Sequence, residues 1–109
     1  MQAGQLRHRI SVQAKAGGKD DFGNVRTDWT EVLSARAKKE ELSGRELFAA
    51  QAVSSEITTR FRIRHRDGIK ASMRIVTADG TAYNIISSID RDGRRRELQI
   101  LCSSGLSNG

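Results

Sequence analysis

Proline is absent from this sequence of 109 residues, and cysteine, aromatic residues and long apolar runs are scarce. The single cysteine, Cys102, excludes a disulfide scaffold. No apolar run approaches the ~18–20 residues of a membrane span, and residues 1–10 lack the apolar segment of a secretory signal. With only five aromatic residues, the core must be mainly aliphatic. We expect one soluble, intracellularly made domain over residues 1–102 and a loose polar tail over 103–109.

Positive charge is in excess. The chain has 19 Lys and Arg residues against 13 Asp and Glu, which gives a net charge of +6, and most of the basic residues are arginine. The planar guanidinium fork suits contacts with phosphate and carboxylate groups. The composition is therefore compatible with a nucleic-acid partner but does not require one.

Alternating apolar and polar residues predict two strands in the first half. In residues 6–13, one face carries Leu6, His8, Ile10 and Val12. A segment rich in Gly, Lys and Asp, residues 15–28, predicts a long flexible loop. A second strand is expected over 29–39, and its consecutive apolar residues indicate a bulge between Val32 and Leu33. The expected inward residues of this strand are Trp29, Val32, Leu33, Ala35 and Ala37.

One helix is predicted after these strands. Ser43 and Glu46 have the spacing of a capping box, and residues 45–53 contain no helix breaker. A helix of about three turns is too short to be stable alone in water, so it must pack on the sheet or on another chain. The face available for packing carries Leu47, Ala50 and Val53.

Strand periodicity is strongest in the second half. The expected strands are 57–65, 73–77, 82–89 and 96–102. Asp67–Gly68 and Asp92–Gly93 are turn signals, and Asp79–Gly80 is the signature of a two-residue hairpin. In total, about six strands and one short helix predict a mainly β chain that forms a small antiparallel β-barrel with a long flexible loop.

The residue inventory argues against catalysis. His8 and His65 are expected on inward strand faces as structural residues, and Cys102 as a small core hydrophobe. Asp20 and Asp21 lack the alternating ligands and closing Glu of a calcium loop. The sequence has no phosphate-binding loop, no dinucleotide-binding glycine motif and no nucleophile elbow. We therefore expect a protein that is not an enzyme and has no cofactor or metal.

The strongest functional feature is a set of arginines at spacing two. They are Arg60, Arg62, Arg64 and Arg66. A regular strand places all four on one face, at intervals of ~6.5–7 Å. That face is either solvated and neutralised by cross-strand carboxylates such as Glu97 or Asp90, or a basic surface that faces phosphate or an acidic neighbour. The arginines at 91–96 either extend it or are solvated turn charges. The interleaved aromatic residues of a single-strand-binding barrel are missing.

An ordered series of short segments runs along nearly the whole chain. It begins with Gly4-x-Leu6-Arg7-His8-Arg9-Ile10 and Gln13, an Asp/Gly loop before Trp29, Ala35-Arg36-Ala37 and Ser43-Gly44-Arg45-Glu46. It continues with Thr58 to Arg66 centred on Ile63-Arg64, then Met73-Arg74-Ile75, Tyr83-Asn84-Ile85 and Arg96-Glu97-Leu98. This series resembles the phage head–tail joining family, also called head-closure or stopper proteins. The chain departs from the family in having His65 where an aromatic residue is common, no tryptophan near Ala35, and a short tail without acidic residues.

The resemblance implies a small β-barrel that assembles as a homo-oligomeric ring beneath the portal and adaptor of a tailed-phage capsid. Such a ring closes the channel around packaged double-stranded DNA and offers the surface to which tail proteins, the tail terminator or tail tube, dock. It implies a location in the virion neck, with no catalysis, cofactor or membrane. Three groups of candidate contact residues follow. They are Arg60, Arg62, Arg64 and Arg66 as an electrostatic surface, Lys19, Asp20, Asp21, Phe22 and Asn24 in the loop, and Ser43, Arg45, Glu46 and Phe48 in the helix segment.

Two alternative functions stay open at this point. The first is a tail-terminator or adaptor ring of the same neck, which would bind free tails rather than DNA-filled heads. The second is a monomeric nucleic-acid-binding β-barrel, which predicts tight, steeply salt-dependent DNA binding by the isolated monomer. A ring instead predicts weak DNA binding until its subunits assemble.

Overall fold

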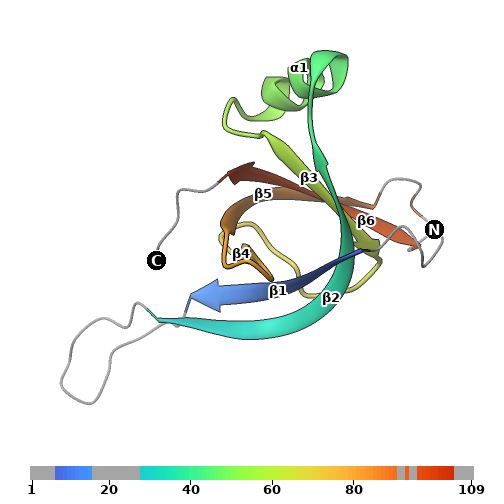
Figure 1. The fold of residues 1–109 in the computed structure, drawn as a ribbon. Coiled ribbons are helices and arrows are strands. Elements are labelled where there is room, and N and C mark those ends of the chain that lie inside the picture. The colour runs from blue at the N-terminus through green and yellow to red at the C-terminus, as the bar shows by residue number, and fades with distance from the viewer. Residues whose placement is uncertain (1–6, 16–27, 91–92, 94–95, 105–109) are drawn as a thin grey trace.

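A closed antiparallel β-barrel is the core of the computed structural model, which describes residues 7–15, 28–90, 93 and 96–104 (Figure 1). The predicted fold class is therefore confirmed. The strands follow the order β1-β2-β3-β6-β5-β4 around the barrel, and β1 pairs with β4 to close it. The elements are β1 (His8–Lys15), β2 (Trp29–Glu41), α1 (Gly44–Val53), β3 (Thr59–Arg64), β4 (Arg74–Thr77), β5 (Ala82–Asp90) and β6 (Glu97–Ser104).

The bulge predicted in the second strand is present. Val12 of β1 pairs with Leu33, and the next residue, Gln13, pairs with Glu31, so Val32 has no partner in this ladder. The prediction that Val32 points inward is wrong, because its side chain is 47% exposed. The extra residue absorbs the break in alternation and leaves Leu33 on the inner side, packed against the core.

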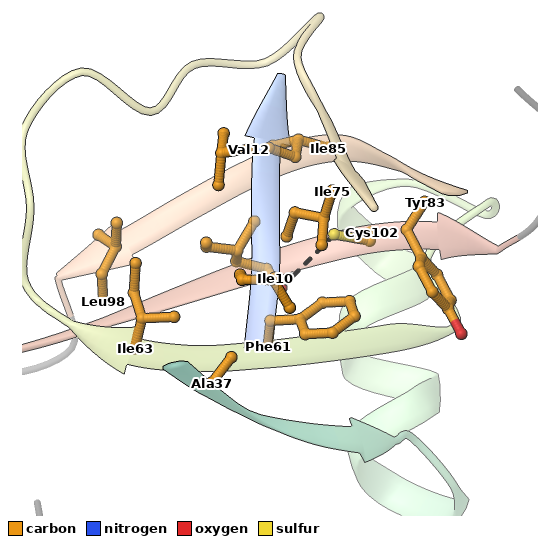
Figure 2. Close-up of a cluster of buried hydrophobic side chains, with 11 residues drawn as sticks. Ile10, Val12, Ala37, Phe61, Ile63, Ile75, Tyr83, Ile85, Leu98 and Cys102 are labelled. Atoms are coloured by element: carbon orange, nitrogen blue, oxygen red, sulfur yellow. Dashed lines mark hydrogen bonds between the residues drawn. The ribbon is translucent and has the colours of Figure 1, made fainter. Parts of the chain in front are cut away.

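The barrel interior is filled by side chains from all six strands (Figure 2). Phe61 and Tyr83 meet edge to face, with ring centroids 5.2 Å apart. Cys102 is a buried core residue, as predicted, and burial raises the pKa of its thiol. His65 is half-buried, whereas His8 is exposed where the sequence predicts an inward residue, because it stands at the very start of β1. The core comprises Ile10, Val12, Ala37, Phe61, Ile63, Ile75, Tyr83, Ile85, Leu98, Ile100 and Cys102.

The hairpin between β4 and β5 differs from the prediction in its loop length. Thr77 N donates to Thr81 O at 3.0 Å and Gly80 N donates to Thr77 O at 2.9 Å. The loop therefore has three residues rather than two, and Gly80 takes positive φ, 89°, at its last position. The carboxylate of Asp79 accepts hydrogen bonds from the Thr77 hydroxyl and from Thr81 N.

The helix forms where the sequence predicts it, with different contacts. Ser43 is its N-cap residue, but the Ser43 side chain makes no capping hydrogen bond, so the predicted capping box is wrong. Gly44, the first helical residue, has φ 55°. None of the helical residues is buried, and α1 lies outside the barrel, beyond the ends of β2 and β3 (Figure 1). In the described ranges no helix is long and apolar enough to cross a membrane.

Candidate functional site

The four arginines predicted on one strand face divide into two pairs. Arg60, Arg62 and Arg64 alternate with the buried residues Thr59, Phe61 and Ile63, which places these three arginines on the outside of the barrel. Arg60 and Arg62 lie within β3 and are each 18% exposed. The last two, Arg64 at the end of β3 and Arg66 beyond it, are exposed.

The first pair, Arg60 and Arg62, is neutralised by carboxylates. Arg60 donates through Nε to Glu40 Oε1 at 2.7 Å, and its Nη2 lies 2.7 Å from Glu46 Oε2. Arg62 lies 3.0 Å from Glu97 Oε1 through Nε and 3.7 Å from Glu40 Oε2 through Nη1. Burial opposes the charged form of Arg60, but the hydrogen bonds and charges of Glu40 and Glu46 outweigh it and raise the pKa of Arg60. This half of the surface is an ion-pair network.

The same network holds α1 against the barrel. Glu46 belongs to the first turn of the helix, and the carboxylate expected to cap that helix bridges to Arg60 of β3 instead. Gln51 Nε2 donates to the carbonyl oxygen of Ile57 at 3.2 Å, which adds a second tie. The sequence correctly indicated Glu97 as a partner of the arginines. Asp90, the other candidate, approaches His65, with Oδ2 and Nε2 3.9 Å apart.

The second pair, Arg64 and Arg66, has different contacts. Arg66 Nη1 donates to the carbonyl oxygen of Ser34 at 3.2 Å. Arg64 makes no ion pair with any residue that the structure describes. Two arginines outside the predicted set, Arg9 of β1 and Arg36 of β2, are also exposed on the outer face and directly opposite one another. Alternation showed which face each occupies, but not that their strands are neighbours.

The helix segment exposes apolar side chains. Phe48 is 83% exposed and Val53 is 69% exposed, and Leu47 is half-buried. Ser43, Arg45 and Glu46 of the predicted contact segment are exposed as well. The second group of candidates, Lys19, Asp20, Asp21, Phe22 and Asn24, lies outside the described residues, as does most of the arginine cluster at 91–96.

Within the described ranges, no three His, Cys, Asp or Glu residues gather as metal ligands. The described chain is thus a small closed β-barrel with an ionic outer face and one peripheral helix whose apolar residues are exposed. The phage head completion protein family matches residues 1–105, and the chain belongs to that family. The protein is thus a structural protein of the virion with a role in head completion, and its family is not a family of enzymes.

Two solved structures share the fold. Protein SF1141 from Shigella flexneri 2a is 30% identical, with a TM-score of 0.77 over 96% of this chain and 97% of that one. A chain in the virion of a native gene transfer agent particle is 14% identical, with a TM-score of 0.57 over 92% and 96% of the two chains. No curated protein matches the sequence. The family match carries the functional assignment, and the gene transfer agent chain shows the fold alone.

Proposed function

We propose that the protein assembles as a homo-oligomeric ring beneath the portal and adaptor of a tailed-phage head. In that position it closes the DNA exit channel after packaging and presents the surface to which tail proteins dock. Membership of the head completion family supports this role. The proposal includes a location at the neck of the virion, after synthesis in the host cytoplasm.

The structural observation that supports assembly is the unburied helix α1. A helix of ten residues is only marginally stable in water without tertiary packing. Its largest apolar side chain, Phe48, contributes to no core within the described chain. A neighbouring subunit or the adaptor would bury this side chain and Val53. We assign the segment from Ser43 to Val53 to contacts between subunits, and the loop containing Phe22 stays a prediction for contact with a neighbour or the tail.

Native mass spectrometry tests the proposal directly. The purified chain would be measured alone, mixed with DNA-filled tailless heads, and mixed with free tails. We expect a monomer on its own and a fixed multiple of copies on the heads. Binding to free tails but not to heads would instead identify a tail-terminator ring. A monomer that ignores both particles and binds free duplex DNA would identify a nucleic-acid-binding module.

A further inference from the structure

The strand registers indicate that three arginines on adjacent strands, Arg9, Arg36 and Arg64, form a row across the outer face of the barrel. Arg9 of β1 lies directly opposite Arg36 of β2. On the other side of β2, Lys38 pairs with Arg62 of β3, and extending this register by two residues sets Arg36 beside Arg64. The hydrogen bond from Arg66 to the Ser34 carbonyl, two residues further along, agrees with that register. All three members of this arginine row are exposed.

The arginine row is electrostatically unfavourable for the isolated chain. Like charges directly opposite one another destabilise a sheet. Glu97 of β6 lies directly opposite Arg64, but its carboxylate pairs with Arg62, and that of Glu40 pairs with Arg60. In the part of the chain that the structure describes, no member of the row makes an ion pair. Among the described residues, the fold thus neutralises one half of its basic surface through ion pairs and leaves the arginine row without any, which is the kind of local conflict that marks a functional surface.

The chemistry of the arginine row fits phosphate. Neighbouring strands are about 4.8 Å apart, so three adjacent strands present their guanidinium groups over a width of about 10 Å. Duplex DNA carries one negative charge per about 1.7 Å of its axis, so that width faces several phosphates. Beside Arg9, a hollow of about 220 Å³ is lined in part by the hydroxyl-bearing Ser11, Ser34 and Thr77, and hydroxyl groups are common phosphate donors. Glu31 also lines the hollow, where it accepts a hydrogen bond from Ser11.

A second copy of this chain is a poorer match for the arginine row. Among the described carboxylates, those of Glu40, Glu46 and Glu97 are paired with arginines, and that of Asp79 is bound within its own turn. The exposed Glu31 and Glu41 lie opposite Gln13 and Thr59, and Glu56 lies outside the strands, so the described glutamates form no complementary cross-strand row of free acids. We propose that Arg9, Arg36 and Arg64 contact the phosphate backbone of the duplex DNA that passes through the ring. This inference rests on the proposed function and names the surface that would face the DNA.

The inference is tested by measuring duplex DNA binding by a variant in which the three arginines of the row are replaced by neutral glutamine. The variant R9Q/R36Q/R64Q is compared, per charge removed, with K15Q/K70Q, which removes charge from exposed residues at the end of β1 and in the loop before β4. Binding to a fluorescently labelled duplex of mixed sequence is followed by anisotropy between about 50 and 200 mM salt. The row variant should lose at least tenfold in affinity at low salt, and the control no more than two- to threefold. The slope of log K against log salt should fall by about 0.9 for each phosphate that the variant no longer neutralises.

Several results would overturn the inference. They are no duplex binding by the wild type at low salt, equal losses of affinity per charge removed in the two variants, or an unchanged salt slope in the row variant. Thermal melting serves as the control for folding of the row variant. Removing exposed arginines that make no ion pair should leave its melting temperature at or above that of the wild type.

Measuring how the row variant joins phage heads distinguishes a failure of this inference from a failure of the proposed function. If the row variant joins heads in the wild-type copy number but the particles lose DNA, the inference is supported. If the variant binds duplex normally but fails to join heads, the arginine row contacts an acidic protein surface and the inference is wrong, although the ring proposal stands. If wild-type protein never joins heads, the ring proposal fails, whatever the DNA measurements show.

Discussion

Gly44 determines how the chain enters α1. Its φ of 55° lies in the left-handed region, and no atom stands within 4 Å of the position a Cβ would take. Alanine is the best helix former, so helix propensity alone predicts that Gly44→Ala stabilises the protein. We expect the opposite, a loss of about 1 kcal/mol from backbone strain. Urea unfolding measures it, and Gly44→Asn, which tolerates left-handed φ better, should lose less. A more stable alanine variant would contradict the backbone geometry.

Replacing Ser43 tests whether its hydroxyl caps α1. A serine that caps a helix through its hydroxyl loses about 0.5–2 kcal/mol when it is replaced by alanine. Since the Ser43 side chain makes no such bond, Ser43→Ala should reduce the free energy of unfolding by less than about 0.5 kcal/mol. Equilibrium denaturation measures the loss. Thr59→Ala, at a fully buried position, serves as the comparison that should lose stability. A loss of about 1 kcal/mol or more at Ser43 would show that its hydroxyl caps α1 in solution.

Asp79 is the residue with a clear pH signature. The Thr77 hydroxyl and the Thr81 backbone N–H lower the pKa of its carboxyl from 3.8 to about 2. Because the folded pKa is depressed, this contribution to stability is present above pH 3.8 and is lost as the pH falls toward 2. Carboxyl titration by NMR should show the low midpoint. Thr77→Val should raise the pKa toward 3.8, whereas Thr77→Ser should keep it low; equal midpoints in the two variants would exclude the hydroxyl as the cause.

At the scale of the element, α1 is expected to serve assembly rather than the stability of the single chain. Phe48→Ala removes an 83% exposed ring and should change the free energy of unfolding by no more than about 0.5 kcal/mol. Phe61→Ala, in the core, should cost about 3–5 kcal/mol. The Phe48 variant should nevertheless join phage heads in fewer copies, as counted by native mass spectrometry. Wild-type incorporation would remove Phe48 from the subunit contact.

The strands show how far a sequence pattern reaches. Alternation correctly predicted the faces of β3, and two consecutive apolar residues correctly predicted the bulge in β2. Alternation is a property of one strand, however, and it does not say which strands are neighbours. The pairing of Arg9 with Arg36 depends on the register between β1 and β2, and the ion pair between Glu46 and Arg60 depends on where α1 rests on the barrel. Neither could be predicted from spacing.

At the scale of the whole molecule, Cys102 reports on the integrity of the barrel. Its side chain is fully buried, and burial raises the pKa of the thiol, so both access and ionisation oppose reaction. We expect the native protein to resist a thiol reagent at mildly alkaline pH, with a labelling rate that follows global unfolding. Adding urea should increase that rate in parallel with the unfolded fraction. Rapid labelling without denaturant would show that the barrel opens locally near β6.

Strand order also determines when the barrel can close during synthesis. In the described chain β6 is the last strand made, yet it lies between β3 and β5 and pairs with both. In a nascent chain that has reached only Asp90, β3 pairs with β2 alone and β5 with β4 alone, so each of these two strands has one open edge. Such edges are templates for pairing with other chains, and non-local pairings of this kind form slowly. A chain stalled before Glu97 should therefore aggregate, and the last eight described residues should convert it into a closed, self-contained subunit.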